Sequence, residues 1–224
     1  MGYSPDLSKI SIDAYKEILK NQYILPSRKI LHQDMDSSFD AIHSCQIKNL
    51  SELKNALSTI QKLTAFSEKS GLSKDYLTIL KREIGSIEPK TTLLKDFPEV
   101  DVETINSLTD AGIKSSRDYY DFYSSFKDIN EITQKILVST DKAQELISLC
   151  NLVRINGVGA VAAKSFFDAG YKSVNDVANT TAEEMLERVS KVNDIKQYYK
   201  VKLGTKDMQF CIDFAKIIAK LESV

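Results

Sequence analysis

Residues 155–178 read INGVGAVAAKSFFDAGYKSVNDVA, which is the most distinctive stretch of this 224-residue sequence. Gly157 and Gly159 flank one apolar residue, and a run of small residues follows them. A backbone without Cβ atoms lets another molecule approach its N–H groups closely. A helix that begins just after such a turn also offers unpaired N–H groups and the positive end of its dipole. The stretch therefore favours an anion site, with a phosphate as the natural ligand. The alternative is a packing module whose glycines are required only by the tight turn.

A second copy of this pattern lies 58 positions earlier, in FPEVDVETINSLTDAGIKSSRDYY at residues 97–120. The two segments align without a gap, so that Asp-Ala-Gly at 110–112 falls on Asp-Ala-Gly at 168–170. A glycine in this place is typical of a helix that ends in the left-handed conformation. Each copy is therefore predicted to form a hairpin, a helix, a glycine C-cap and a short second helix.

The rest of the sequence shows helical periodicity, without sustained alternation of apolar and polar residues. Ser73 precedes one such helical pattern and is a predicted N-cap. A fainter third copy occupies residues 39–53, where Gln46 replaces the glycine. We expect an all-α fold of about a dozen short helices. Its N-terminal region, 1–92, would hold the degenerate copy, and residues 93–224 would hold the tandem copies and a C-terminal helix.

The upstream copy has acidic residues where the downstream copy has glycines. Glu99 aligns with Gly157, and Asp101 aligns with Gly159. A carboxylate at a helix N-terminus satisfies the free N–H groups internally and repels a phosphate. The sequence therefore predicts that Asp101 caps its helix and that the upstream copy is structural.

The charge of the whole chain is balanced, with 30 basic and 31 acidic residues. A strongly electrostatic nucleic-acid-binding protein has a basic excess, so any such binding here must be local. Residues 191–206 carry five lysines against Asp194, a net charge of +4, with Tyr198 and Tyr199 among them. Lysines with interleaved tyrosines can neutralise phosphates and stack on bases. The same pattern is equally typical of a solvated helix end with its tyrosines in the core.

Several functional classes find no support in the sequence. We expect no enzyme, because no catalytic constellation or carboxylate cluster with metal-site spacing is present. His32, His43 and Cys45 match no common metal site. The odd number and wide spacing of the three cysteines predict reduced core residues of a cytoplasmic protein. No apolar run reaches membrane-spanning length, so we expect no membrane partner.

A nucleotide cofactor is the obvious alternative ligand for the glycine turn. Gly157 to Ala162 satisfies the dinucleotide-binding pattern G-x-G-x-x-A, and Asp176 follows at a suitable distance. That pattern functions only between a strand and a helix in a βαβ unit. Residues 171–186 contain a turn and helix starts rather than a second strand. We therefore expect no cofactor.

The segment from Ile155 to Gly159, with Ala163 and the Asp-Ala-Gly at 168–170, resembles the helix-hairpin-helix motif. The whole chain resembles an uncharacterised helix-hairpin-helix family described as a domain of unknown function. The resemblance implies that backbone N–H groups of the hairpin bind a DNA phosphate without reading sequence. It also implies a possible monovalent cation on the carbonyls of Val153, Ile155 and Val158. Val161 departs from the pattern, because DNA-binding members often carry a basic residue there.

The resulting hypothesis is a non-enzymatic protein that binds nucleic acid, DNA above all, weakly and without sequence preference. The competing hypothesis is a helical scaffold for a protein partner that makes no contact with nucleic acid. The predicted binding residues are those of the hairpin and the nearby lysines: Gly157, Val158, Gly159, Ala160, Val161, Lys164, Lys196, Lys200 and Lys202.

Overall fold

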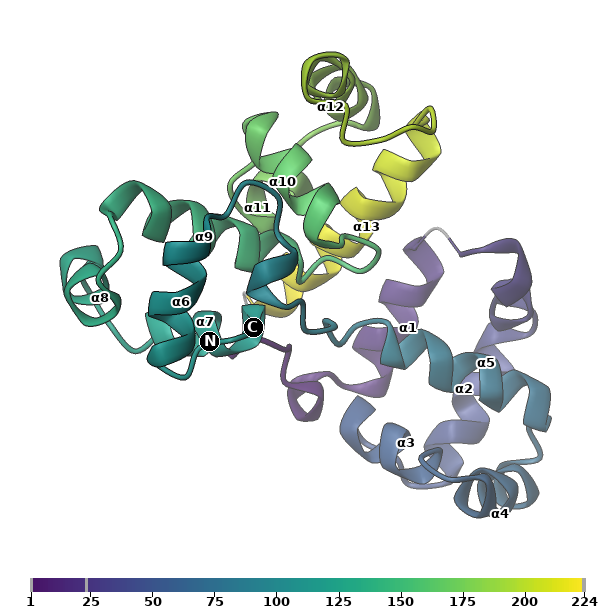
Figure 1. The fold of residues 1–224 in the computed structure, drawn as a ribbon. Helices are drawn as coiled ribbons and strands as arrows, with labels where there is room; N and C mark the ends of the chain where they lie inside the picture. The colour runs from purple at the N-terminus through teal and green to yellow at the C-terminus, as the bar shows by residue number, and fades with distance from the viewer. Residues whose placement is uncertain (1, 23, 223–224) are drawn as a thin grey trace. The chain divides into compact units, whose positions relative to one another are not determined.

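The computed structural model describes residues 2–22 and 24–222, and this part of the chain is all-α (Figure 1). It contains no β-strand; two isolated β-bridges join Ser11 to Asn49 and Leu93 to Ser115. The predicted fold class is therefore confirmed. Without a strand beside Gly157, the βαβ setting that a dinucleotide cofactor requires is also missing from the described residues.

The chain forms two compact units, residues 5–88 and residues 2–4 together with 89–222. The smaller unit is built from η1 (Leu7–Lys9), α1 (Ile12–Asn21), η2 (Pro26–His32), α2 (Met35–Ser44), α3 (Leu50–Ala56), α4 (Ile60–Ser70) and α5 (Lys74–Gly85). Ser73 caps α5 as predicted, because its hydroxyl accepts the Tyr76 N–H at 3.1 Å. Apolar residues at helical spacing fill the core, including Tyr15, Leu19, Phe39 and Leu80.

The larger unit holds both copies of the glycine-bearing pattern. Its elements are η3 (Leu94–Asp96), α6 (Val102–Asp110), α7 (Ser116–Tyr123), α8 (Ile129–Ile136), α9 (Thr140–Leu152), α10 (Ala160–Asp168), α11 (Val174–Ala178), α12 (Ala182–Lys196) and α13 (Thr205–Glu222). The long helix α13 packs against α11 and α12 (Figure 1). Its buried stripe, Met208, Cys211, Ile212, Ala215 and Ile218, forms part of the core.

The ends of α6 and α10 have the same local hydrogen bonds, 58 positions apart. Gly112 and Gly170 both adopt left-handed backbone angles, with φ of +80° and +97°. After each glycine the next N–H returns to the helix: Ile113 donates to the Leu108 carbonyl at 2.8 Å, and Tyr171 donates to that of Phe166 at 2.9 Å. The glycine C-caps predicted from the sequence are therefore present.

The short second helices α7 and α11 also begin alike. Ser115 accepts the Asp118 N–H, and Ser173 accepts the Asp176 N–H. Each aspartate in turn accepts a backbone N–H just before its helix, at Ser115 and at Lys172. These side-chain caps satisfy donors that a helix start leaves unpaired.

The third, fainter segment reaches the same backbone conformation without a glycine. Gln46 lies between α2 and α3 with φ of +64°. Asn49 then caps α3, and the Glu52 carboxylate accepts the Lys48 N–H at 2.8 Å. A left-handed residue with a Cβ costs free energy, so Gln46 is a strained position.

Replacing Gln46 by glycine should therefore stabilise the protein. We expect Gln46→Gly to raise the free energy of unfolding by about 1 kcal/mol, because it relieves the left-handed strain. Urea denaturation followed by circular dichroism measures the change. Gln33 is a matched control, since it is also an exposed glutamine in the same unit but has φ of −79°. Gln33→Gly should lower stability by roughly 0.5–1 kcal/mol; equal losses in both variants would contradict the strain at Gln46.

Candidate nucleic-acid interface

The turn before α10, residues 155–158, requires a glycine at position 157. Gly157 has φ of +85°, and the Val158 N–H closes the turn onto the Ile155 carbonyl at 3.0 Å. A Cβ at position 157 would lie 2.9 Å from Cε1 of Phe210 on α13. Gly157 is therefore needed both for its backbone conformation and for the close packing of α13 against the hairpin.

Gly159 has no such structural reason to be glycine. It is the N-cap of α10, with φ of −92° and ψ of −176°, and a Cβ there would meet no atom within 4 Å. The position is exposed, so the space above its backbone is open. A side chain would fit here, yet the sequence has none.

The N-terminus of α10 consequently keeps its donors free. No side chain caps it, and its first turn holds no acidic residue. The first intrahelical bond runs from the Ala163 N–H to the Gly159 carbonyl at 2.9 Å. The N–H groups of Ala160, Val161 and Ala162 precede that bond, so the helix itself provides them with no acceptor. This arrangement is suited to an anion.

The counterpart in the upstream copy is closed. Asp101 caps α6 as the sequence predicts, with Oδ1 accepting the Thr104 N–H at 2.9 Å. Lys142 on α9 pairs with the same carboxylate at 2.7 Å. The hydrogen bonds from Lys142 and then from Thr104 hold the pKa of Asp101 well below its usual value. A negative charge therefore occupies the place that a phosphate would take.

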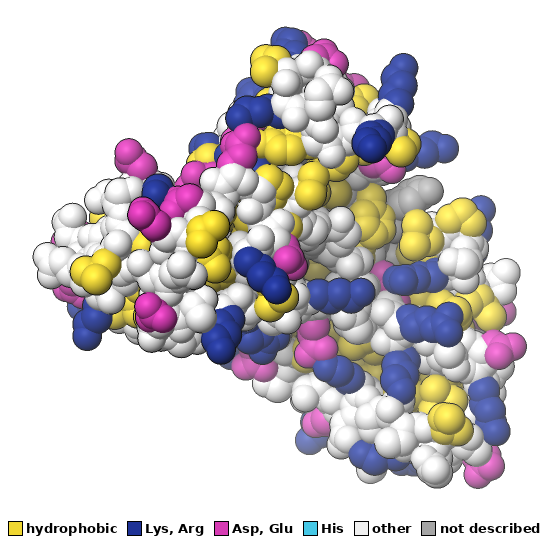
Figure 2. All heavy atoms as spheres, in the orientation of Figure 1, with side chains coloured by type: hydrophobic (Ala, Val, Ile, Leu, Met, Phe, Trp, Pro, Cys, Tyr) yellow, Lys and Arg dark blue, Asp and Glu magenta, His cyan; other side chains and the backbone are white. Residues whose placement is uncertain are grey.

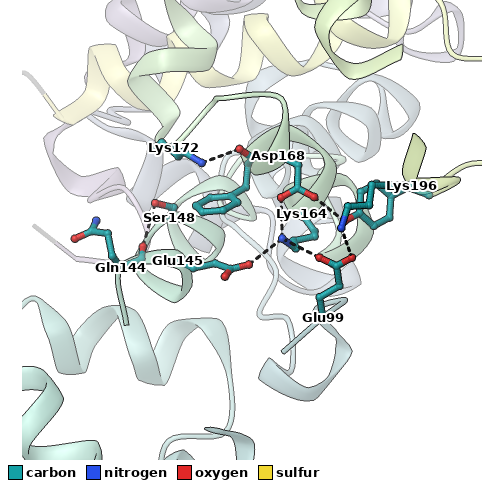
Figure 3. A network of polar contacts seen from close by, with 10 residues as sticks. Glu99, Gln144, Glu145, Ser148, Lys164, Asp168, Lys172 and Lys196 are labelled. Atoms are coloured by element: carbon teal, nitrogen blue, oxygen red, sulfur yellow. Dashed lines mark hydrogen bonds and ion pairs between the residues drawn. The ribbon is translucent and has the colours of Figure 1, made fainter. Parts of the chain in front are cut away.

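Glu99, in the turn before α6, connects that turn to α10 and to the end of α12. It takes the left-handed conformation of its counterpart Gly157, with φ of +64°. Its carboxylate pairs with Lys196 at 2.7 Å and with Lys164 at 3.3 Å (Figure 3). Both lysines were predicted to contact nucleic acid, but here they hold two segments of the unit together.

Lys164 lies at the centre of this network. Its ammonium also contacts Glu145 on α9 at 3.0 Å and Asp168, one turn along α10, at 2.7 Å. The side chain is only 6% exposed. Burial lowers the pKa of Lys164, but the hydrogen bonds to Asp168 and Glu145 outweigh it and leave the pKa above its usual value. The charge of Lys164 is thus balanced internally.

The lysine run divides into paired and unpaired members. Lys191 pairs with Glu187 at 2.6 Å, in addition to the Lys196 pair with Glu99. Lys200, Lys202 and Lys206 are exposed, and no acid in the described residues forms an ion pair with them. Figure 2 shows dark blue side chains gathered over the connection between α12 and α13, with little magenta among them.

Lys206, which is not among the predicted binding residues, lies in the first turn of α13. It precedes Phe210 by four residues, so the two side chains share one face of α13. Phe210 is the residue that contacts the turn at Gly157. The helical pattern around residue 206 indicates the shared face, but the contact between α13 and the hairpin is long-range and leaves no local signal.

The two tyrosines of the run are fixed by the protein. The Tyr198 hydroxyl donates to Asp168 at 2.7 Å. The Tyr199 backbone is bound on both sides by Asn193, whose Oδ1 accepts its N–H at 2.7 Å and whose Nδ2 donates to its carbonyl at 3.2 Å. Burial raises the pKa of Tyr199 to about 12, so the phenol is neutral at physiological pH and does not repel an anion.

Arg154, just before the hairpin, is fully buried and has a structural role. Its Nε donates to the Tyr3 carbonyl at 2.9 Å, and its guanidinium forms an ion pair with Glu222. It also lies over the Tyr120 ring, 4.7 Å from the centroid. Arg154 therefore anchors the start of the hairpin against three other segments and presents no charge to solvent.

These features define an all-α protein in which the helix that follows a glycine turn, α10, begins without a side-chain cap. Residues 98–216, more than half of the chain, match the family described as Domain of unknown function (DUF4332). The chain belongs to this family. A search of the curated proteins and a search of the solved structures found no match.

No group of three or more His, Cys, Asp or Glu side chains in residues 2–22 and 24–222 is placed to hold a metal ion. None of the helices in that part of the chain has both the length and the apolar character that crossing a bilayer requires.

The network around Lys164 makes a testable distinction between two lysines. Lys164→Met leaves three carboxylates without their common partner and should cost about 2 kcal/mol, less than a fully buried pair because Glu99 and Glu145 keep some solvent. Lys196→Met, at the exposed edge, should cost less than about 1 kcal/mol. Chemical denaturation measures both values.

The loss in Lys164→Met should also shrink as the pH is lowered from 7 towards 5. Mutual repulsion raises the pKa of the remaining carboxylates in the folded variant, so their penalty is complete above that raised pKa and is lost as the pH falls from it towards the ordinary carboxyl pKa. Equal, small losses at both lysines would show that Lys164 is not the centre of the network.

Proposed function

We propose that this protein binds nucleic acid weakly and without sequence preference, with a backbone phosphate on the N–H groups at the start of α10. The observation that carries the proposal is the contrast between two equivalent helix starts. Asp101 fills the N-terminus of α6, whereas Gly159 leaves that of α10 exposed, uncapped and open. A phosphate would supply the acceptors that the protein itself does not.

We propose further that residues 97–120 and 155–178 are two copies of a helix-hairpin-helix module. The matching glycine C-caps and the matching serine caps 58 positions apart support this assignment. In the upstream copy, Glu99 and Asp101 replace the hairpin glycines and bind lysines of the same unit. That copy then serves as a structural partner, and one hairpin alone contacts the ligand.

The positive charge for binding comes from Lys200, Lys202 and Lys206 in this proposal. Lys164 and Lys196 are excluded as phosphate ligands because carboxylates already pair with them. Two or three neutralised phosphates imply a Kd of about 10⁻⁴–10⁻⁶ M at physiological salt. They also imply a shallow log–log dependence on salt, with a slope near −2 to −3 on duplex DNA.

A monovalent cation on the hairpin stays a prediction. Of the three carbonyls concerned, at Val153, Ile155 and Val158, that of Ile155 accepts the Val158 N–H. A carbonyl oxygen has a second lone pair, so this bond is compatible with a cation.

A protein partner is the second candidate, because two large apolar side chains flank the same lysines. Ile195 is 81% exposed and Val201 is 77% exposed. Large apolar side chains that gather into an exposed patch are typical of interaction surfaces. A scaffold of this type would use the connection between α12 and α13 without engaging the hairpin.

The variant Gly159→Asp separates these two functions. It copies Asp101, and the open space at Gly159 accepts the side chain, so the new cap should keep or raise the melting temperature. It should nevertheless abolish the share of binding due to the hairpin, because a carboxylate then occupies the phosphate position. Fluorescence anisotropy with labelled oligonucleotides at low salt measures the binding.

Gly159→Ala is the matched control, because it adds a Cβ without an acceptor or a charge. It should leave the helix start open and binding close to that of the wild type. Wild-type protein that is folded and binds neither single-stranded nor duplex oligonucleotides would remove the nucleic-acid proposal and favour the scaffold.

A further inference from the structure

A cavity of about 410 Å³ lies between the C-terminal half of α12 and the segment that leads into α13. Its volume is within the range of small-ligand sites, roughly 300–1,000 Å³. It is lined by Leu186, Ser190, Asn193, Asp194, Tyr199, Lys200, Val201, Lys202 and Leu203. The walls thus combine aliphatic side chains, one aromatic ring and two cations.

The charges around this cavity favour an anionic ligand. Lys200 and Lys202 are exposed, and neither forms an ion pair in the described part of the chain. Asp194 is the one acidic residue in the lining, so the lining has a net charge of +1. Flexible lysines at the rim can reach a phosphate while their stems cover apolar surface.

The aromatic wall is held in a fixed position. Asn193 binds both the N–H and the carbonyl of Tyr199, so the backbone that carries this ring is clamped to α12. Ser190, on the same wall, is half-buried, and its hydroxyl forms no hydrogen bond with another described residue. The Tyr199 ring can stack on the face of a base, and the Ser190 hydroxyl can bind the edge of that base. The two lysines can bind the phosphate of the same nucleotide.

We propose that this cavity receives one unstacked base of a single-stranded nucleic acid, which would make the protein prefer single strands over duplexes. This inference rests on the proposed function, since the hairpin at α10 would hold a phosphate of the same strand. A base–aromatic stack contributes without regard to sequence, because every base has a π face. A duplex would first have to expel a paired base, which costs a few kcal/mol.

The path of the polypeptide supports the binding of one nucleic-acid strand by both the cavity and the start of α10. The segment that lines the cavity continues directly into Lys206 and Phe210 on the first turns of α13. Phe210 contacts the turn at Gly157. The cavity lysines, Lys206 and Phe210 therefore follow one another along the chain, and Phe210 reaches the turn that precedes α10.

The test uses the full-length protein and an oligo(dT) strand with a single 2-aminopurine. The sequence has no tryptophan, so the base analogue can be excited without a protein signal. Binding should quench its fluorescence as it stacks on Tyr199, in parallel with the anisotropy of an end-labelled strand. The single strand should bind about tenfold more tightly than the duplex of the same length, as expected for one stacked base.

Variants locate the effect in the cavity. Ser190→Phe fills the cavity from α12 and should remove the quenching and the single-strand preference, while duplex binding is unchanged. Lys200→Gln with Lys202→Gln should weaken single-strand binding. Lys127→Gln with Lys135→Gln is the matched control, because both lysines are exposed, lie elsewhere in the same unit and form no ion pair with a described residue. Circular dichroism and thermal unfolding establish that each variant is folded.

The outcomes separate this inference from the proposed function. One outcome overturns the cavity site and leaves the hairpin site standing. In it, single strand and duplex bind equally, 2-aminopurine fluorescence does not change, and Gly159→Asp loses the binding of both oligonucleotides. Displacement of the oligonucleotide by poly-glutamate of matched charge at equal concentration also overturns it, because the cavity would then select an acidic chain. Absence of any nucleic-acid binding contradicts both.

Discussion

The first N–H groups of a helix need acceptors, and the two matching helix starts in this protein meet that need differently. At α6 the Asp101 carboxylate supplies the acceptor and is itself stabilised by Lys142. At α10 no side chain does so, and the position that could carry one is Gly159, where nothing in the structure requires a glycine. A polar group that the protein could satisfy but leaves open is suited to an external ligand. The functional proposals depend on this one difference.

The upstream segment, whose helix α6 is capped by Asp101, helps to hold α10 in place. Glu99 accepts a left-handed backbone that glycine would adopt more easily, and its carboxylate binds Lys164 and Lys196. Lys164 also gathers Glu145 and Asp168, so residues before α6, on α9 and on α10 meet at one buried charge (Figure 3). Breaking such a network leaves unpaired buried charge, which is costly. The network therefore positions α10, buries Lys164 and pairs the exposed Lys196 with Glu99, which limits the electrostatic contribution to binding.

Much of the fold follows from the sequence because its signals are local. The helical periods, the N-caps at Ser73 and Asp101 and the left-handed glycines at 112 and 170 involve residues within a few positions of each other. The candidate site was harder to predict, because its charges are decided by long-range contacts. Position alone made Lys164 a candidate phosphate ligand, whereas its burial among three carboxylates depends on packing between α9 and α10. The contact of Phe210 with Gly157, made by the helix that also carries Lys206, is likewise absent from any local pattern.

The most direct test of the central claim is an NMR titration of ¹⁵N-labelled protein with oligo(dT), which observes individual backbone N–H groups. The amide signals of Gly159, Ala160 and Val161 should shift progressively with added oligonucleotide. Those of Val102, Glu103 and Thr104 at the capped start of α6 should stay in place, since Asp101 already occupies that helix end. Shifts at α6, or unchanged signals at the start of α10 while the oligonucleotide is bound, would contradict the account.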